Sequence, residues 1–382
     1  MRPARRKSAR PRGTADRLYG CPESNYCSSV GLVRWDSLSD HAAGPGRGPG
    51  PALPLFEAGA VSRTFDTPAF RGITFHEVRA RTIINRVPAA SRMPFRWTVN
   101  PYRGCSHACA YCYARYSHTY LGLDAGLDFN TQVVVKVNAA ELAAMELAAP
   151  RWQGEHVAMG TNVDCYQRAE GRYRLMPGII AALAGAANPF SIVTKGTLIL
   201  RDLDLIAAAA EVTDVGLNVS VGFTDPRLWR SVEPGTPSPQ RRLAACAAIS
   251  ARGLRCGVLM GPVLPFLTDS PSQLAGTVRQ IAAAGAAHVS PVVLHLRPGA
   301  REWYLRWLGE QHPGLVPRYR ELYRAGAYAP RAYQRHIAEQ VRKLASQHGV
   351  GRASPARARR LPPRGSASHR GAASHDVQLS LL

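Results

Sequence analysis

The 382-residue chain lacks any run of about 18 consecutive apolar residues, the length that a membrane-spanning helix requires. Its first residues, MRPARRKSARPRGTADR, are basic and polar and contain no apolar segment of the kind found in secretory signals. We therefore expect a cytoplasmic protein with no membrane partner. Lysine is also scarce, with four residues among the 48 Lys and Arg. An arginine bias of this kind can reflect genome base composition as easily as phosphate binding.

The formal net charge of +22 is concentrated at the two ends of the chain. Residues 1–20 hold seven basic residues and one acidic, and residues 342–382 hold eight and one, so residues 21–341 carry only +9. Both ends are rich in Pro, Gly, Ser and Arg, a composition that buries too little surface to offset the entropy of ordering. We expect a largely flexible basic extension over 1–54, a folded core over 55–341 and a disordered basic tail over 342–382.

The folded core alternates apolar, β-rich runs with Ala- and Leu-rich helical stretches. The six main runs are 95–99, 155–160, 190–194, 216–222, 255–261 and 287–294. They predict a parallel sheet with right-handed crossovers, either partly closed into a barrel or open and doubly wound. We predict an α/β fold, a partial (β/α)6 TIM-like barrel, with its chemistry at the carboxyl ends of the strands. A further run, 132–137, is expected to be an edge strand or an excursion.

Three of the eight cysteines lie together in NPYRGCSHACAYCYAR, directly after the first strand. Cys105, Cys109 and Cys112 have the spacing C-x3-C-x2-C, which suits thiolates wrapped around one face of a soft metal centre. A structural zinc site usually needs four ligands, and His107 is too close in sequence to complete a tetrahedron comfortably. An iron–sulfur cluster with one iron free of protein ligands therefore fits this loop better than zinc does.

With Tyr111 just before the last cysteine, this loop resembles the signature of the radical S-adenosylmethionine (SAM) superfamily. The segments MGTNVDCYQRAEGRYRL, SIVTKGTLILRDLDL and VSVGFTDPRLWRSVEPGTPSPQRRL resemble its spore photoproduct lyase branch, also described as DNA repair photolyase-like, and an actinobacterial subgroup within it. The resemblance covers roughly residues 50–340. It implies a [4Fe–4S] cluster on the three cysteines and SAM on the fourth iron. It also implies reductive cleavage of SAM to a 5′-deoxyadenosyl radical, with an electron donor such as flavodoxin or ferredoxin.

The resemblance also implies roles for residues at the first two strand ends. Tyr111 would shield the cluster and approach the adenine of SAM. Gly160, Thr161 and Asn162 end the second strand, where this superfamily binds the SAM amino group, although the usual Gly-Gly-Glu is absent. Asp164 is close by and is an alternative for that role, and an ordinary strand-to-loop turn is the plain structural reading.

Further candidates end the later strands. Lys195 is placed to meet the SAM carboxylate or a substrate phosphate, and Ser220 to reach the SAM ribose or carboxylate. Met260 lies in a fifth-strand segment whose backbone would bind adenine, although a plain buried strand reads the same way. His295 and Arg297 end the sixth strand, where they either contact substrate or SAM or form a structural corner.

The remaining cysteines have less specific readings. In spore photoproduct lyase a cysteine in the second-strand region donates a hydrogen atom to the product radical, and Cys165 is the candidate for that catalytic role here. It does not align at the family position, so an inert buried thiol is the competing interpretation. Cys246 and Cys256 are expected in the core, and Cys21 and Cys27 are expected to be exposed and unligated.

The chain ends in a short apolar peptide after a Pro-, Ser- and Arg-rich tether. Its last five residues are Gln378, Leu379, Ser380, Leu381 and Leu382. They resemble the peptide by which bacterial polymerases and repair proteins bind the DNA sliding clamp. A few apolar anchors and a Gln on a flexible tail make a binding peptide that orders on contact.

Three functions are consistent with these features. The first is a radical SAM enzyme acting on damaged or modified DNA. The second is the same chemistry on a peptide, an RNA or a small molecule, with the positive charge incidental. The third is a non-catalytic iron–sulfur protein recruited through its tail. SAM cleavage by the reconstituted protein separates the third from the others, and salt-dependent nucleic-acid binding without the tails separates the first two.

Overall fold

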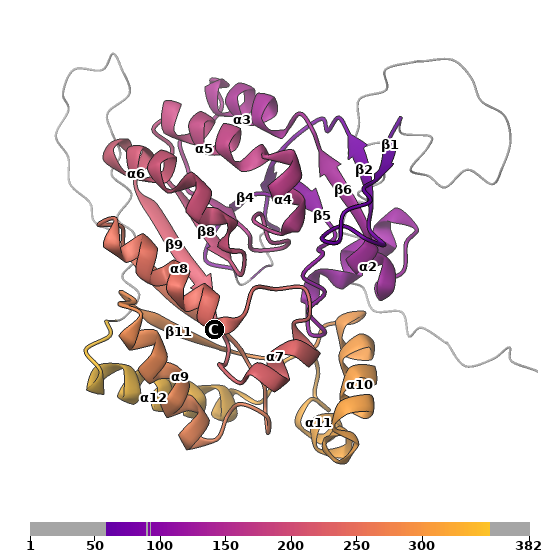
Figure 1. Ribbon diagram of the computed structural model, residues 1–382, viewed down its shortest axis with the longest axis vertical. Helices are drawn as coiled ribbons and strands as arrows, with labels where there is room; N and C mark the ends of the chain where they lie inside the picture. The colour runs from indigo at the N-terminus through magenta and orange to yellow at the C-terminus, as the bar shows by residue number, and fades with distance from the viewer. Residues whose placement is uncertain (1–58, 89–90, 92, 352–382) are drawn as a thin grey trace, which may run out of the picture. The chain divides into compact units, whose positions relative to one another are not determined.

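The computed structural model describes residues 59–88, 91 and 93–351 (Figure 1). The expected extension 1–54 and the tail from 352 onward lie outside the described residues. The last helix, α12 (Arg331–Gln347), crosses the tail boundary that we placed at 342. Ile337, Val341 and Ala345 recur at helical spacing and bury one face of this helix, so its last turns belong to the folded core.

The large sheet has seven strands in the order β11-β10-β9-β8-β7-β4-β3. Six of them are mutually parallel: β4 (Trp97–Val99), β7 (Val157–Met159), β8 (Phe190–Thr194), β9 (Val215–Ser220), β10 (Cys256–Val263) and β11 (Val289–Val293). The short strand β3 (Ile84–Arg86) pairs antiparallel with β4 at the edge. The predicted six-stranded parallel arrangement of a partial barrel is confirmed.

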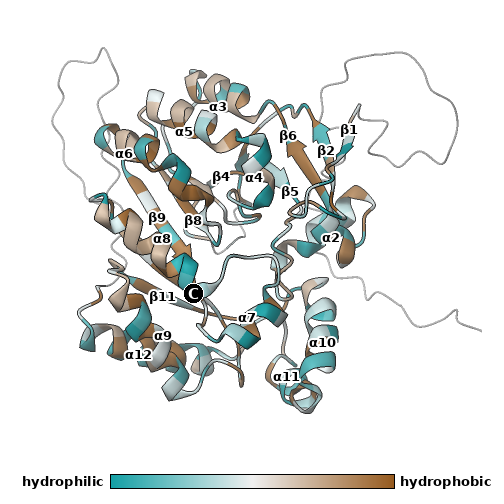
Figure 2. Cartoon of the chain, viewed as in Figure 1, coloured by the Kyte–Doolittle hydropathy of each residue, from teal (hydrophilic) through white to brown (hydrophobic). Residues whose placement is uncertain are grey.

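Helices connect the parallel strands and cover the sheet. They are α3 (Ala139–Ala148), α4 (Arg168–Tyr173), α5 (Leu175–Gly185), α6 (Leu203–Val212), α8 (Pro239–Ala251) and α9 (Pro271–Ala283). Helices α8 and α9 begin at prolines, and Ser238 and Ser270 cap them through side-chain oxygens that accept from the amides of Arg241 and Gln273. Figure 2 shows hydrophobic colour along β6 and β8, whereas α4 and α7 are mostly hydrophilic. Within the described residues no helix is long and apolar enough to cross a bilayer.

A second, small sheet is built from strands that lie before and after β4 in the sequence. Its strands are β1 (Val61–Thr64), β2 (Thr74–Val78), β6 (Gln132–Lys136) and β5 (Tyr102–Arg103), in the order β1-β2-β6-β5. The run expected as an edge strand or excursion is thus an inner strand of a separate sheet. The chain leaves β4 at Val99 and enters β5 at Tyr102, so it changes sheets immediately before Cys105.

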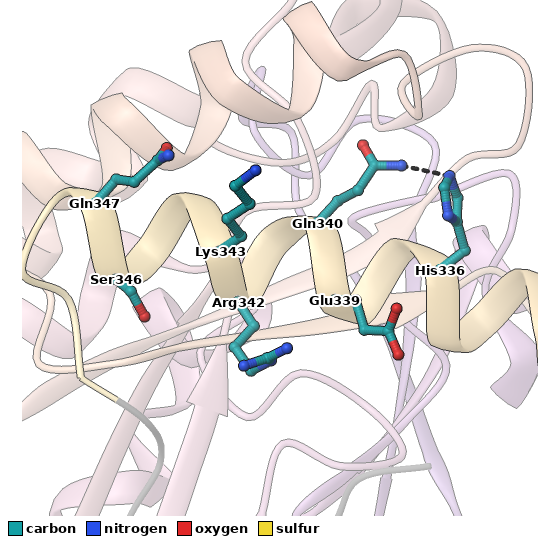
Figure 3. Close-up of a pocket in the computed structure, with 7 residues that line it drawn as sticks. All are labelled: His336, Glu339, Gln340, Arg342, Lys343, Ser346 and Gln347. Carbon is teal, nitrogen blue, oxygen red and sulfur yellow. Dashed lines mark hydrogen bonds between the residues drawn. The ribbon is translucent and has the colours of Figure 1, made fainter.

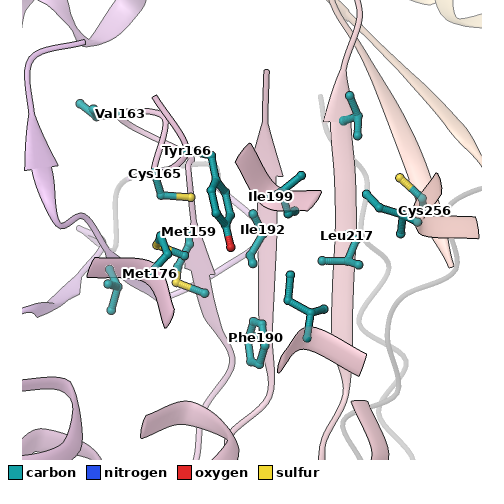
Figure 4. Close-up of a cluster of buried hydrophobic side chains, with 14 of the residues drawn as sticks. Met159, Val163, Cys165, Tyr166, Met176, Phe190, Ile192, Ile199, Leu217 and Cys256 are labelled. Carbon is teal, nitrogen blue, oxygen red and sulfur yellow. The ribbon is translucent and has the colours of Figure 1, made fainter. Parts of the chain in front are cut away.

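The remaining elements of the described residues are helical segments. They are η2 (Tyr113–Leu121), α2 (Leu127–Thr131), η3 (Thr197–Asp202), α7 (Pro226–Val232), α10 (Ala300–Gln311), η4 (Pro313–Leu315) and α11 (Val316–Leu322). One buried cluster lies between the sheets and the crossover helices (part of it is shown in Figure 4). A second contains Cys109 and Tyr111 with Tyr304, Trp307 and Tyr319. The cysteine loop therefore packs against the C-terminal helices as well as the barrel.

Candidate active site

The cysteine loop is tightly wound between β5 and η2. The amide of Cys105 donates to the carbonyl of Phe129 at 2.9 Å, and that of Cys112 donates to the carbonyl of Cys109 at 3.2 Å. Ala108 has φ of +54°, a left-handed conformation that a residue with a side chain adopts only when its surroundings hold it there. Cys105 and Cys109 are buried and Cys112 is half-buried, so the loop gathers three thiols away from bulk water.

Arg115 fixes this loop to the neighbouring elements. Its side chain is fully buried. Its guanidinium donates to the carbonyl of Cys109 at 2.9 Å, the carbonyl of Gly126 at 2.7 Å and the amide oxygen of Asn130 at 3.0 Å. It also lies 4.7 Å from the ring of Trp303 on α10. One arginine thus joins the cysteine loop to α2 and α10, a role that its sequence position gave no sign of.

The three thiols fit an iron–sulfur cluster by their chemistry. Burial raises the pKa of each, to about 12 for Cys109, while the positive charges of Lys195 and Arg242 oppose the shift there. Nowhere among the described residues are three His, Cys, Asp or Glu side chains arranged to hold a single metal ion. The thiolates of a [4Fe–4S] cluster bind different iron atoms, so its ligands need not converge on one point.

Asp164 joins the second and third barrel strand ends. Its carboxylate accepts from Thr194 Oγ1 at 2.6 Å and from the amide of Lys195 at 2.7 Å, and lies 3.3 Å from His107 Nδ1. Burial alone would raise the pKa of Asp164, but His107 and these hydrogen bonds outweigh burial and lower it to about 2. Asp164 thereby links His107 to the end of β8, and its alternative role toward the SAM amino group stays a prediction.

Three of the residues predicted to bind SAM come together beside the cysteine loop. Lys195 Nζ donates to Ser220 Oγ at 3.0 Å and lies 5.6 Å from the ring centroid of Tyr111. Ser220 Oγ in turn donates to the carbonyl of Gly261 at 3.0 Å. The charge of Lys195 acts on both Cys109 and Cys112. Residues from β8, β9 and the cysteine loop therefore form one polar group at the carboxyl ends of the strands.

No hydrogen bond joins the side chains of the other candidates to that group among the described contacts. Gly160, Thr161 and Asn162 follow β7, and the carbonyl of Thr161 accepts from the hydroxyl of Tyr113. Met260 is fully buried in the barrel core, so β10 offers the carbonyl of Gly261 rather than this side chain.

Cys165 is fully buried, and Figure 4 shows it beside Tyr166 and Met159 in the apolar core. Burial raises the pKa of its thiol well above the ordinary value. Its role as a hydrogen-atom donor stays a prediction. Cys246 and Cys256 are buried on α8 and β10, as expected for core thiols.

Aromatic and cationic side chains, which we call the aromatic wall, lie together after β11 and beside the cysteine loop: Tyr113, His295, Arg297 and Tyr328. The ring of His295 lies 5.3 Å from that of Tyr113 and stacks on Tyr328 at 5.5 Å. Arg297 Nη2 donates to the hydroxyl of Tyr328 at 3.0 Å. Burial, together with the charge of Arg297, lowers the pKa of His295 to about 4. Tyr113 directly follows Cys112, so its place in the site could have been predicted from the cysteine motif. Tyr328 lies in no motif, and no signal in the sequence pointed to it.

A surface cavity of about 610 Å³ lies elsewhere, along α12 (Figure 3). Its lining residues are His336, Glu339, Gln340, Arg342, Lys343, Ser346 and Gln347. All of them come from one helix and none belongs to the polar group or the aromatic wall. This cavity is a solvated helix face and not the candidate site.

Comparison with known proteins agrees with this geometry. The model of the radical SAM superfamily matches residues 99–276. An uncharacterized protein of Mycobacterium tuberculosis (strain H37Rv) is 54% identical over 297 residues, which cover 78% of this chain and 87% of that protein. An uncharacterized protein of Methanocaldococcus jannaschii is 29% identical over 195 residues, covering 50% and 69%. The chain belongs to the radical SAM superfamily, whose members use a [4Fe–4S] cluster and SAM.

The similar solved structures narrow the fold further. Spore photoproduct lyase with bound AdoMet and dinucleoside spore photoproduct superposes with a TM-score of 0.55 at 16% identity, covering 74% of this chain and 83% of that one. A second structure of that lyase, in complex with the dinucleoside photoproduct, gives a TM-score of 0.53 at 16% identity, with the same coverage. The chain thus has the fold of spore photoproduct lyase.

Proposed function

We propose that this chain is a radical SAM enzyme acting on damaged or modified DNA. The observation that carries the proposal is the aromatic wall beside the cysteine loop, because Tyr328 is 48% exposed and its neighbour Arg297 is exposed too. Aromatic rings stack on nucleobases and arginines contact phosphates, so this wall suits an unstacked nucleotide. The likeness in fold to a lyase solved with a dinucleoside photoproduct supports the same substrate class.

The residues have distinct tasks in this proposal. Cys105, Cys109 and Cys112 hold the cluster, while Lys195 and Ser220 bind the polar end of SAM. When bound, these cofactors supply one-electron cleavage of SAM and abstraction of a hydrogen atom from the substrate. The surrounding side chains exclude water and fix the substrate at the strand ends. Cys165, a fully buried thiol five residues beyond Gly160, is the proposed source of a returning hydrogen atom.

The central experiment is product analysis. Anaerobically reconstituted, reduced protein is given SAM and ultraviolet-irradiated DNA, and 5′-deoxyadenosine and the DNA products are measured. We expect four irons per chain, SAM cleavage and a change in a DNA lesion. SAM cleavage with unchanged DNA would point instead to a peptide, RNA or small-molecule substrate. Bound iron without SAM cleavage would point to a non-catalytic iron–sulfur protein.

Nucleic-acid binding gives a second test of the substrate. In a protein shortened to residues 55–351, Arg297→Gln and Tyr328→Ala should each weaken binding of single-stranded DNA about tenfold. The matched control is Arg279→Gln, an exposed arginine on α9 away from the strand ends, which should leave affinity within about twofold. Equal losses in the variants and the control would mean that the positive charge is non-specific.

We also propose that residues 378–382, which lie outside the described residues, bind the DNA sliding clamp. The proposal rests on the sequence Gln-Leu-Ser-Leu-Leu at the end of a basic tether. Full-length protein should co-elute with the clamp, and protein lacking these five residues should not. Unchanged co-elution after the deletion would end this proposal. A flavodoxin or ferredoxin is proposed as the electron donor.

A further inference from the structure

A buried acid lies directly behind the cysteine loop. Glu233 is fully buried, and its carboxylate accepts from the hydroxyl of Tyr111 and from Nη2 of Arg242. Arg242, on α8, is only 1% exposed. Tyr111 stands between Cys109 and Cys112, so this ion pair reaches the thiols through a single phenol ring. Charges this deeply buried are costly unless each has a partner, and here each has one.

Two backbone hydrogen bonds hold the segment that carries Glu233 against the loop. The amide of Ala110 donates to the carbonyl of Val232 at 2.9 Å, and that of Gly235 donates to the carbonyl of His107 at 3.0 Å. A β-carbon at residue 235 would overlap the carbonyl of Ser106, so this close approach requires glycine. The carboxylate of Glu233 is therefore fixed relative to the cysteines at both ends of its segment.

The ion pair continues into the polar group at the strand ends. Arg242 Nη1 donates to the carbonyl of Ser220 at 2.8 Å, and Ser220 accepts from Lys195 at 3.0 Å. Glu233 thus belongs to a network with two positive charges, the buried Arg242 and the half-buried Lys195, and Asp164 is a second acid that accepts from the amide of Lys195. Inside a protein, where screening is weak, a fixed charge near an iron–sulfur cluster changes the free energy of adding an electron.

We propose that Glu233 is a positioning residue for the radical SAM reaction. It holds Tyr111 over the cysteine loop, and its negative charge, balanced by Arg242, sets the reduction potential of the bound cluster. This inference rests on the cofactors of the superfamily and not on DNA as the substrate. It can therefore hold or fail independently of the proposed substrate.

The test is the midpoint potential of the reconstituted cluster, followed by electron paramagnetic resonance during reductive titration. Glu233→Gln keeps an acceptor for Tyr111 but removes the charge, so the potential should shift to a more positive value. The double variant Glu233→Gln/Arg242→Gln restores neutrality, so its potential should return toward that of the unaltered protein. Equal potentials in Glu233→Gln and the unaltered protein, or in the single and double variants, would overturn the proposal.

The chain offers a matched control in a second triad of the same chemistry. Glu170 is fully buried, accepts from the hydroxyl of Tyr102 at 2.6 Å and pairs with Arg201 at 2.6 Å. Glu233 is one of the charges with the largest effect on Cys109, whereas Glu170 is not among the largest for any of the three loop cysteines. Glu170→Gln should leave the midpoint potential of the cluster unchanged. A shift as large as that of Glu233→Gln would mean that loss of any buried acid disturbs the cluster, and it would overturn the proposal.

A further variant covers the case in which Glu233→Gln loses its cluster. Tyr111→Phe leaves the ion pair intact and removes only the hydroxyl that it holds. We expect its cluster to keep the potential of the unaltered protein and to show a changed resonance spectrum on adding SAM, because the ring is no longer fixed. An unchanged spectrum would show that Glu233 does not act through Tyr111 and would overturn the proposal.

Discussion

Gly160 and Val193 lie in such close contact that a β-carbon on Gly160 would overlap the carbonyl oxygen of Val193. Gly160 also has φ of +75°, in the left-handed region that favours glycine. The residue sits where the chain leaves β7, and Val193 lies in the neighbouring strand β8. This contact presses the backbone that precedes Thr161 against β8, and it fixes where that loop can stand relative to Lys195.

Replacing Gly160 with alanine should therefore be severe. Gly154→Ala is the matched control, because Gly154 has a similar φ of +69° but nothing within 4 Å of an added β-carbon. We expect Gly154→Ala to cost about 1 kcal/mol in free energy of unfolding and Gly160→Ala about 3 kcal/mol or more. Urea unfolding of the two apoproteins measures the difference. Equal losses would show that the close contact with Val193 is absent in solution.

Arg115 should be irreplaceable even by lysine. A lysine keeps the charge but lacks the planar fork that reaches the carbonyls of Cys109 and Gly126 together. We expect Arg115→Lys to lower the free energy of unfolding by about 3 kcal/mol and to reduce iron retention. The control is Arg306→Lys, an exposed arginine over the same Trp303 ring, which should change stability by less than about 1 kcal/mol.

The three loop cysteines should differ sharply from the core cysteines in iron binding. Cys105→Ala, Cys109→Ala and Cys112→Ala should each lose most of the bound iron and all SAM cleavage, because no other thiol stands in the loop. Cys256→Ala, in β10, should keep its iron and cost about 1–2 kcal/mol in stability as a small core truncation. Iron and 5′-deoxyadenosine assays on the four variants provide the comparison.

Cys165→Ala isolates the proposed hydrogen-donor role. Because Cys165 is fully buried in the barrel core and is not one of the loop cysteines, iron content and SAM cleavage should be unchanged. The donor role then predicts altered DNA products with normal 5′-deoxyadenosine formation. Normal products would make Cys165 a core thiol and nothing more.

Lys136 should make stability depend on pH. Its side chain is 4% exposed, and burial followed by the charge of Arg103 lowers its pKa from 10.5 to about 7. Below pH 7 the folded protein bears the full cost of burying a protonated amine. Between pH 7 and 10.5 the unfolded chain binds more protons than the folded one, so the free energy of unfolding rises with pH.

Lys136→Met removes this dependence. We expect the variant to be more stable by up to about 4 kcal/mol at pH 6, with the advantage shrinking by pH 9. Urea unfolding of both proteins at the two pH values measures it. A difference that stays constant with pH would mean that the lysine is paired or solvated in the folded protein.

The sequence predicted the large sheet well and the small sheet poorly. The run Phe190–Thr194 holds Phe190, Ile192 and Val193, lies between Pro189 and Lys195, and is buried at alternate positions, so its sequence predicted a strand. By contrast β5 is two residues long and β1 is exposed throughout, so neither has a periodicity to detect. Their pairing with β2 and β6 is set by tertiary packing.

Some residues of the candidate site could likewise be predicted from local sequence, and others could not. The cysteine spacing and the polar residues at strand ends are local signals, and they led to Lys195 and Ser220. Arg115, Glu233 and Arg242 carry charges that are ordinarily solvated, and their burial depends on partners distant in sequence. No pattern within one segment could have shown that these residues support the cysteine loop.

The short connection from β4 to β5 means that the small sheet positions the cysteine loop. Only Asn100 and Pro101 separate the two strands, so the cysteine loop is mounted on the small sheet while Lys195 and Ser220 are mounted on the large one. Val133 and Val135 of β6 pack in the same core as Val157 and Met159 of β7. Packing in this shared core therefore determines how closely the cysteine loop is held relative to Lys195 and Ser220. Apolar residues of β6 and β7, which lie outside the candidate site, thereby help to keep its residues in register.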